Sequence, residues 1–204
     1  MSKVEKWAIC CPGPSFAKYN IAKKIESFNP DFIVAVNGAV CSNLVFDYWV
    51  MGDIEVFSSA ASIINLPMIA QSTTLWIPDF WLNHINKFPE LSKIFYKFKR
   101  ETWNNLNFEM HIGMGYPWRE YSLFSAIALA VKKGATLIQI YGADMAGSGY
   151  FKPGFENNRT RHNDKRWIDE RFWFTEIVWV CKKFGIEIIR EEVKDAGINN
   201  SAKV

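Results

Sequence analysis

Short runs of apolar residues recur along the chain, and most of them end at a glycine, asparagine or aspartate. The runs at residues 4–11, 32–36 and 48–51 lack the alternation of a half-exposed strand, which predicts strands buried on both faces. Between the first two runs, the pattern predicts a helix with Ser15 as N-cap, ending at about Phe28. Strand, helix and strand in this order are typical of a parallel sheet covered by helices on both faces.

The second half of the chain repeats this pattern. A helix is predicted over residues 118–133, followed by a strand at 137–141. A second helix, at 166–184, is apolar nearly all round, which indicates burial, and a last strand follows at 186–189. We therefore expect a single doubly wound, mostly parallel α/β domain of Rossmann-like type over residues 1–204.

The middle of the chain is less regular. Residues 67–70 and 74–77 each fit a short strand, 79–100 fit two amphipathic helices, and 108–112 fit a further strand. Aromatic and basic residues interleave here, an arrangement that either stacks on sugars and bases or builds a small core of its own. We expect a lid-like insertion at about 70–110 and favour the small core.

The composition excludes several classes of protein. With 49% hydrophobic and 22% charged residues, the 204-residue chain is globular and not disordered. No apolar run is long enough for a transmembrane helix, and the first residues lack the apolar stretch of a signal peptide. The net charge of +3 is too small for bulk binding of nucleic acid. The aromatic content of 16% indicates a dense core, an aromatic-lined site, or both.

The cysteines are scattered and form no CxxC pair. Two of them are neighbours on a predicted buried strand, which argues against a zinc site or a disulfide framework and favours a reducing cytoplasm. The four are Cys10, Cys11, Cys41 and Cys181.

Small or polar residues follow four of the predicted strands. In an open parallel sheet, ligands bind beyond the carboxyl ends of the strands, so we expect these residues to form a ligand site. The first loop opens onto a helix N-terminus, whose free N–H groups and dipole favour phosphate, although it lacks the Walker lysine and the third glycine of a dinucleotide fingerprint. The four segments are Gly13-Pro14-Ser15, Asn37-Gly38, Gly52-Asp53 and Gly142-Ala143-Asp144.

The order and spacing of these motifs resemble two related families. The Gly-Pro-Ser and Asn37 strand ends and the segment 122–144 are similar to the bacterial CMP-sialic-acid sialyltransferases. The archaeal 6-hydroxymethylpterin diphosphokinase-like family shares the overall order and has an aspartate where Asp53 stands. The resemblance covers residues 4–57 and 119–190 and implies a Rossmann-type fold.

The sialyltransferase resemblance implies roles for the matching residues. The general base would be His162, in the loop before the last helix, because histidine takes a proton from a sugar hydroxyl without a large change in its pKa. Asp144 would belong to the catalytic residues, and Ser122 would lie against the nucleotide phosphate. The remaining nucleotide-binding residues would be Gly13, Pro14, Ser15, Asn37, Asp53 and Gly142.

The loop around His162 also concentrates positive charge. Residues 159–166 contain four lysine or arginine residues and one aspartate, and Arg159 and Arg161 would neutralise a departing phosphate. His84 and His111 have weaker claims, since one lies on a predicted amphipathic helix and the other ends a predicted strand.

Three functions remain open from the sequence. We favour a glycosyltransferase of sialyltransferase-like type that moves a sugar from a CMP-linked or related nucleotide to the hydroxyl of an unidentified acceptor, with no metal required. The diphosphokinase alternative implies Mg²⁺, held by Asp53 and Asp144, to bridge phosphates. A nucleotide-binding module without turnover is the third, because Cys11-Pro12 replace the Gly-Asn that precedes Gly-Pro-Ser in the sialyltransferases and Leu123 replaces their glycine. The oligomeric state stays open.

Overall fold

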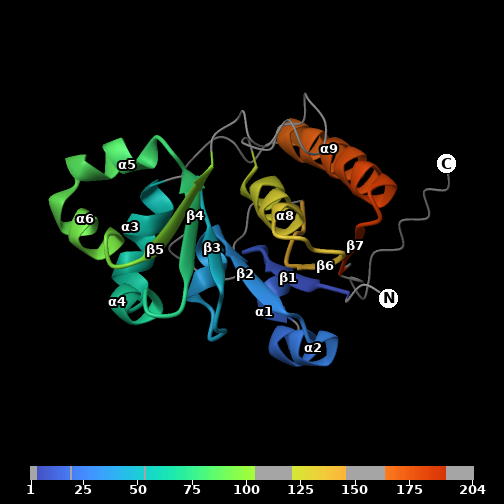
Figure 1. The fold of residues 1–204 in the computed structure, drawn as a ribbon, viewed down its shortest axis with the longest axis horizontal. Helices are drawn as coiled ribbons and strands as arrows, with labels where there is room; N and C mark the ends of the chain where they lie inside the picture. Colours follow the sequence, from blue (N-terminus) through green and yellow to red (C-terminus); the bar gives the residue numbers. More distant parts are fainter. Residues whose placement is uncertain (1–3, 19, 53, 104–120, 146–163, 192–204) are drawn as a thin grey trace.

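A computed structural model describes residues 4–18, 20–52, 54–103, 121–145 and 164–191 (Figure 1). The strands of the described part pair into one fully parallel, seven-stranded sheet. They are β1 (Lys6–Cys10), β2 (Phe32–Val36), β3 (Tyr48–Val50), β4 (Thr74–Pro78), β5 (Lys99–Trp103), β6 (Leu137–Tyr141) and β7 (Glu187–Arg190).

The sheet is wound in two directions from β1. Its strand order is β5-β4-β3-β2-β1-β6-β7, so the chain moves outward from β1 to β5 and then returns to place β6 and β7 on the other side of β1. The order therefore reverses between β1 and β6, where this class of sheet binds its ligands. The doubly wound α/β fold predicted from the sequence is confirmed.

Helices cover both faces of the sheet. In Figure 1, α8 (Ser122–Lys132) and α9 (Asp164–Lys183) lie above the sheet, and α1 (Ser15–Lys18) and α2 (Ile21–Phe28) lie below it. None of the described helices is both long and apolar enough to cross a membrane. Besides α1, α2, α8 and α9, the described helices are η1 (Asn37–Cys41), α3 (Ile54–Ile63), α4 (Leu66–Ile69), α5 (Trp81–His84), η2 (Ile85–Lys87) and α6 (Pro89–Phe95).

The first strand shows why the central runs are apolar without interruption. Trp7 and Ile9 pack with α8 and α9, whereas Ala8 and Cys10 pack in the opposite layer, and all four side chains are fully buried. Successive side chains of a strand point to opposite faces, so a strand covered on both sides needs apolar residues at every position. All four cysteines are buried as free thiols.

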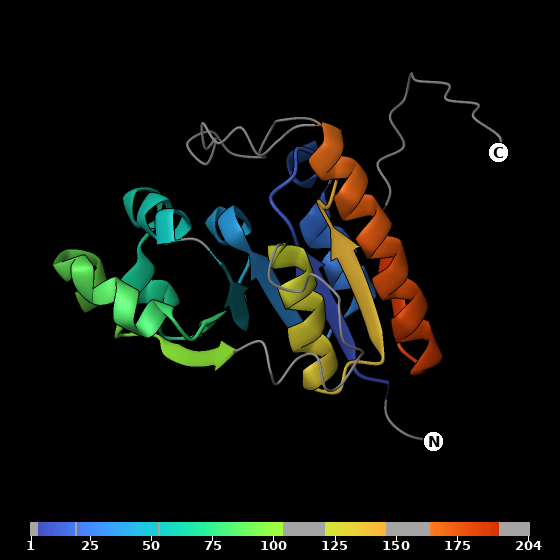
Figure 2. The same ribbon diagram turned by 90° about the horizontal axis from the view of Figure 1, so that it is seen from above.

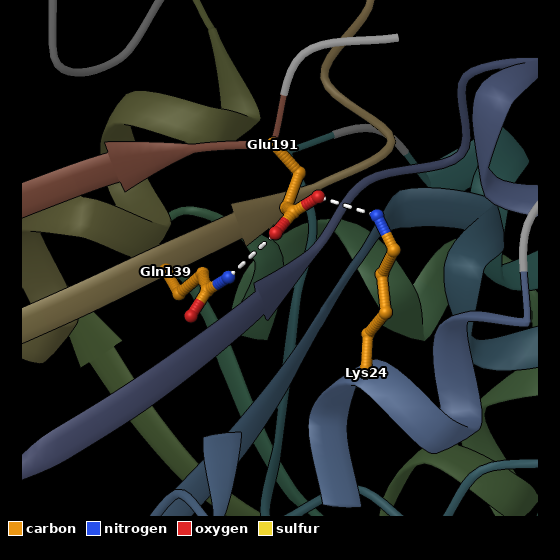
Figure 3. Close-up of polar contacts among 3 residues, drawn as sticks. All are labelled: Lys24, Gln139 and Glu191. Atoms are coloured by element: carbon orange, nitrogen blue, oxygen red, sulfur yellow. Dashed lines mark hydrogen bonds and ion pairs between the residues drawn. The ribbon is translucent and has the colours of Figure 1, made fainter. Parts of the chain in front are cut away.

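Glu191, directly after β7, fastens the sheet edge to the helix layer below it. Its carboxylate accepts a hydrogen bond from Gln139 Nε2 of β6 at 2.9 Å and pairs with Lys24 Nζ of α2 at 2.5 Å (Figure 3). Both side chains of the ion pair are partly exposed, so water screens the attraction and the pair adds little to stability. Its main consequence is geometric, because it joins α2 to two neighbouring strands.

The helix predicted from Ser15 to about Phe28 is two helices. Asn20 interrupts it, and its side chain accepts a hydrogen bond from the Lys23 N–H at 3.2 Å as the N-cap of α2. Asparagine is a strong N-cap, so the local capping geometry wins over continuation of the first helix. As a result, α1 is only four residues long.

The middle segment contributes strands as well as helices. The strand predicted at 74–77 is present as β4, but the strand predicted at 67–70 is wrong. These residues fall largely in α4, where Pro67 occupies the first turn and Asn65 caps the helix. Residues 99–103, whose beginning was predicted to be helical, form β5 and pair with β4, so the described part of the expected insertion widens the sheet. The strand predicted at 108–112 lies outside the described residues.

The last helix is less buried than predicted. Ile168, Phe172 and Trp179 of α9 are each more than half exposed, while Ile177 and Cys181 are fully buried. The helix lies along the β7 side of the sheet, at the opposite end of the molecule from α5 and α6, and presents one side to the sheet (Figure 2). Apolar composition around the whole helix therefore did not mean burial around the whole helix.

Phe57 is the centre of an aromatic cluster in the same core layer as Ala8 and Cys10. Its fully buried ring lies 5.7 Å from that of Trp49, 5.8 Å from that of Phe95 and 6.0 Å from that of Phe98. We predict that Phe57→Ala lowers the free energy of unfolding by about 3–5 kcal/mol, since it leaves a cavity. Phe80→Ala, at a ring that is 59% exposed, should change it by less than about 0.5 kcal/mol. Urea denaturation followed by tryptophan fluorescence measures both, and equal midpoints would contradict the prediction.

Candidate functional site

The loops after β1 and β6 are joined where the strand order reverses. The Cys11 N–H donates to the Tyr141 carbonyl at 2.8 Å, and the Gly13 N–H donates to the Gly142 carbonyl at 2.9 Å. Two residues further along each loop, the Ser15 N–H donates a hydrogen bond to the side-chain oxygen Oδ2 of Asp144 at 2.8 Å. The sequence predicted that these segments would lie at the same sheet edge, and the structure brings them into direct contact.

Two glycines make this contact possible. A Cβ atom on Gly13 would lie 2.4 Å from the Gly142 carbonyl oxygen, and one on Gly142 would lie 2.3 Å from the Cys11 carbonyl oxygen. Gly142 also has φ +69°, a backbone conformation that other residues rarely adopt. Both positions therefore need glycine for the approach of one main chain to another, whatever ligand binds nearby.

The first loop does not offer the free N–H groups that the sequence predicted. Besides Gly13 and Ser15, the Phe16 N–H donates to the Gly13 carbonyl at 3.0 Å and the Ala17 N–H donates to the Pro14 carbonyl at 3.2 Å. Pro14 has no N–H, and α1 is too short for a strong helix dipole. The expected phosphate cradle of backbone amides is wrong, because the contact with the β6 loop and the first turn of α1 use these donors. Binding of a nucleotide by Gly13, Pro14 and Ser15 through other groups stays a prediction.

Asn37 presents an unused acceptor at the end of β2. Its backbone is left-handed, with φ +48°, and its carbonyl accepts the Trp49 Nε1 hydrogen bond at 2.9 Å. The side-chain Oδ1 is buried and has no hydrogen-bond partner among the residues that the structure describes. A buried acceptor without a partner is destabilising, so a ligand that donates a hydrogen bond there would offset that cost.

The N-terminus of α8 is the other unsatisfied part of this edge. Its N-cap, Tyr121, makes no capping hydrogen bond, and within the described residues the N–H groups of Ser122 and Leu123 have no acceptor. Ser122 Oγ lies 3.9 Å from where a Cβ of Gly52 would stand, so the helix begins beside the end of β3. Free N–H groups at the start of a helix favour an anion, which fits the predicted place of Ser122 against a phosphate.

Glu170 is a buried carboxyl that the sequence analysis missed. It lies on α9, is 8% exposed, and has Arg166 Nε at 3.9 Å from its Oε2, too far for a hydrogen bond. Burial raises the pKa of Glu170 to about 7, against the opposing charges of Arg166 and Arg171. The available signal was an acidic residue on the side of a helix that otherwise packs on the sheet.

Arginines attach the first half of α9 to this edge. The Arg166 guanidinium lies 5.1 Å from the ring of Tyr121, next to the start of α8. Arg171 Nη1 donates to the Met145 carbonyl at 2.8 Å, directly after Asp144. The pKa of the Cys11 thiol is raised first by burial and then by the charges of Cys10, Glu170 and Asp144.

The predicted catalytic loop is not among these residues. His162, Arg159 and Arg161 lie outside the described part of the chain, as does Asp53, so their roles stay predictions. His84 lies on α5 with its ring 5.8 Å from that of Phe88. In the residues that the structure describes, no three or more histidine, cysteine, aspartate or glutamate side chains gather as a metal site would require.

We predict that Gly142→Ala disrupts the junction of the β1 and β6 loops. The positive φ and the 2.3 Å approach to the Cys11 carbonyl should lower the free energy of unfolding by at least about 2 kcal/mol. Gly52→Ala is the matched control, because the nearest atom to its new Cβ is Ser122 Oγ at 3.9 Å. Thermal unfolding of the two variants measures the difference. A Gly142→Ala melting temperature equal to that of Gly52→Ala would show that the junction tolerates the side chain.

Comparison with known proteins relates the fold to that of one known enzyme. No protein-family model matches the sequence, and no curated protein matches it. The fold is similar to the structure of the sialyltransferase CstII from Campylobacter jejuni in complex with the substrate analogue CMP-3FNeuAc, with a TM-score of 0.53 and 12% identity over 92% of this chain and 81% of that chain. The CstII structure with cytidine-5′-monophosphate matches with a TM-score of 0.49 and 14% identity over 93% and 81% of the two chains. The first match shows that the chain has a sialyltransferase-like fold.

Proposed function

We propose that this protein is a nucleotide-sugar glycosyltransferase of sialyltransferase-like type. The observation that carries the proposal is the carboxyl edge of the sheet, where, among the described residues, Asn37 Oδ1 at the end of β2 and the first N–H groups of α8 have no hydrogen-bond partner. The likeness to the CstII complex with CMP-3FNeuAc supports it, because that fold accommodates a nucleotide sugar. The transferred sugar would go to an acceptor hydroxyl of unidentified chemistry.

The unsatisfied groups suit a nucleotide in complementary ways. The N-terminus of α8, with the Ser122 hydroxyl, would bind the phosphate, since helix dipole and N–H groups both favour negative charge. Asn37 would accept a hydrogen bond from a ribose hydroxyl or a base amine. Gly13, Pro14 and Gly142 would form the wall against which the nucleotide lies, and Ser15 would contribute its side chain.

The reaction is a displacement at the anomeric carbon of the donor sugar. A base takes the proton of the acceptor hydroxyl, the hydroxyl oxygen bonds to the anomeric carbon, and the bond from that carbon to the phosphate oxygen breaks. We assign the base to His162 and neutralisation of the departing phosphate to Arg159 and Arg161. We keep Asp144 in the catalytic set, with its Oδ2 holding the Ser15 N–H and so fixing the loop. This chemistry requires no metal.

We predict that Asn37→Gly weakens nucleotide binding about tenfold, because it removes the amide and leaves the left-handed backbone unstrained. Asn29→Gly is the matched control, since Asn29 also has a left-handed backbone, at φ 52°, but caps the far end of α2. Thermal-shift screening and calorimetry measure the affinities for CMP, UDP, GDP and ATP and for the sugar conjugates of CMP, UDP and GDP. If none of these nucleotides stabilises the wild type, the proposed function is overturned.

We predict that His162→Ala lowers kcat by a factor of about 10²–10⁴ and leaves the donor affinity nearly unchanged. A general base acts on the acceptor hydroxyl, so its loss affects the chemical step more than donor binding. The measurement is transfer from the donor identified in the screen, together with donor affinity by calorimetry. Full turnover by His162→Ala would show that another group is the base.

A further inference from the structure

Glu170 is a buried carboxyl that the proposed function does not use. It projects from the side of α9 that packs on the sheet, where Trp167, Trp173 and Phe174 are partly buried against the same core. Its Oε2 atom is buried and accepts no hydrogen bond from the described part of the chain. An ionised carboxylate in such a place lacks both water and donors, so burial favours the protonated acid.

The neighbours of Glu170 contact residues at the carboxyl edge of the sheet, where the nucleotide site is proposed. Arg166, one helical turn before it, stacks on the Tyr121 ring directly before the first residue of α8. Cys11, whose thiol is influenced by the charge of Glu170, immediately precedes the Pro12-Gly13 turn. Glu170 is therefore linked through Arg166 to the residue that precedes α8, and its charge reaches the thiol at the end of β1, so we infer that the carboxyl faces the proposed nucleotide site.

The titratable groups that act on Glu170, or together with it on Cys11, come from three elements of the described structure. Arg166 and Arg171 on its own helix favour the carboxylate, and the thiol of Cys11 on the β1 side lies within the reach of its charge. Asp144, after β6, also acts on Cys11 and keeps its Oδ2 on the Ser15 N–H. Burial outweighs the two arginines and keeps the pKa of Glu170 at about 7.

A phosphate held at the start of α8 would find no further N–H donors on the first loop and two carboxyls on the neighbouring elements. The N–H groups from Gly13 to Ala17 are all engaged within the chain. Two ionised carboxylates near Cys11 would repel an anion, whereas a protonated one donates a short hydrogen bond to a phosphate oxygen. Glu170 is the better of the two for this role, because Asp144 already accepts a hydrogen bond and the Glu170 Oε2 atom has none.

We propose that Glu170, in its protonated form, binds the nucleotide by donating a hydrogen bond to a phosphate oxygen. This inference rests on the proposed function. The proton stays on the carboxyl and no covalent bond changes. Binding is then linked to the protonation of one side chain.

The direction of the linkage follows from the free protein. Below about pH 7 the free protein already holds the proton, so affinity changes little with pH. Above about pH 7 the free carboxyl is ionised and must take up a proton on binding, so affinity falls by up to about tenfold for each further pH unit. A bound phosphate raises the pKa of Glu170 further, since the negative charge favours the protonated acid.

Calorimetric titration with CMP-3FNeuAc tests the proposal, because its phosphate is a diester that does not titrate near neutral pH. Between about pH 6 and pH 8.5, we expect wild-type affinity to fall at least tenfold, with proton uptake at the higher pH. Glu170→Gln keeps a donor and cannot ionise, so its affinity should vary less than twofold over this range. Glu176→Gln, six residues further along the same helix, should follow the wild type.

Glu170→Met provides a second variant, which keeps the volume, removes the donor and suits the apolar surroundings if glutamine does not fold. We expect it to bind at least tenfold more weakly than the wild type at about pH 6. A pH-independent wild type, a Glu170→Gln variant with the wild-type fall, or wild-type affinity in Glu170→Met would overturn this inference alone. If CMP-3FNeuAc binds the wild type at neither pH and no other nucleotide stabilises it, the proposed function and the inference both fail.

Discussion

The close approach of the loops after β1 and β6 is the constraint on which the rest of the carboxyl edge of the sheet depends. These strands are neighbours in the sheet but are separated in the chain by the whole β2–β5 half, so no connecting helix keeps their ends apart. Gly13 and Gly142 let the two main chains touch, and three hydrogen bonds close the gap from Cys11 to Ser15. The same bonds use the amides that a nucleotide would otherwise find there. Packing of backbone against backbone thus decides which chemical groups remain for a ligand.

The parts of the fold that the sequence predicted well are those where burial on both faces leaves no choice of residue. The apolar run at Phe32–Val36 and the largely apolar run at Leu137–Tyr141, interrupted only by Gln139, became strands with those bounds. Edge positions obey weaker constraints. The sequence of β5 is Lys-Arg-Glu-Thr-Trp, which is polar because the strand lies at the sheet edge, so its hydrophobic pattern could not indicate a strand. The break at Asn20 was missed for a related reason, since a side-chain cap competes with helix continuation over one residue only.

The sequence predicted which edge of the sheet carries the candidate site, but it did not predict the hydrogen bonds among the residues there. Parallel strands bring their carboxyl ends to one edge, so Gly13, Asn37 and Asp144 could be grouped from the sequence alone. Whether an N–H group is free depends on its partner, and the partners of Gly13 and Ser15 come from a loop about 130 residues away. Glu170 was missed because the meaning of a carboxylate depends on its burial. An acidic residue on a helix is usually solvated, and only the packing of α9 on the sheet removes water from this one.

Side-chain donors and backbone amides give an anion site different properties. An amide never ionises near neutral pH, so a loop of free N–H groups binds phosphate with an affinity independent of protein titration. Here the first loop has lost that option, and the described residues still offer the N–H groups at the start of α8 and the side chains next to it. Those side chains are held as a unit, because Arg166 both stacks on Tyr121 and lies 3.9 Å from Glu170. A change in the protonation of Glu170 therefore alters the charge facing the arginine as well as the acid itself. The junction of β1 and β6 uses the amides of the first loop, so an anion of the kind that we propose at this edge would meet the N-terminus of α8 and the charged side chains of α9 instead.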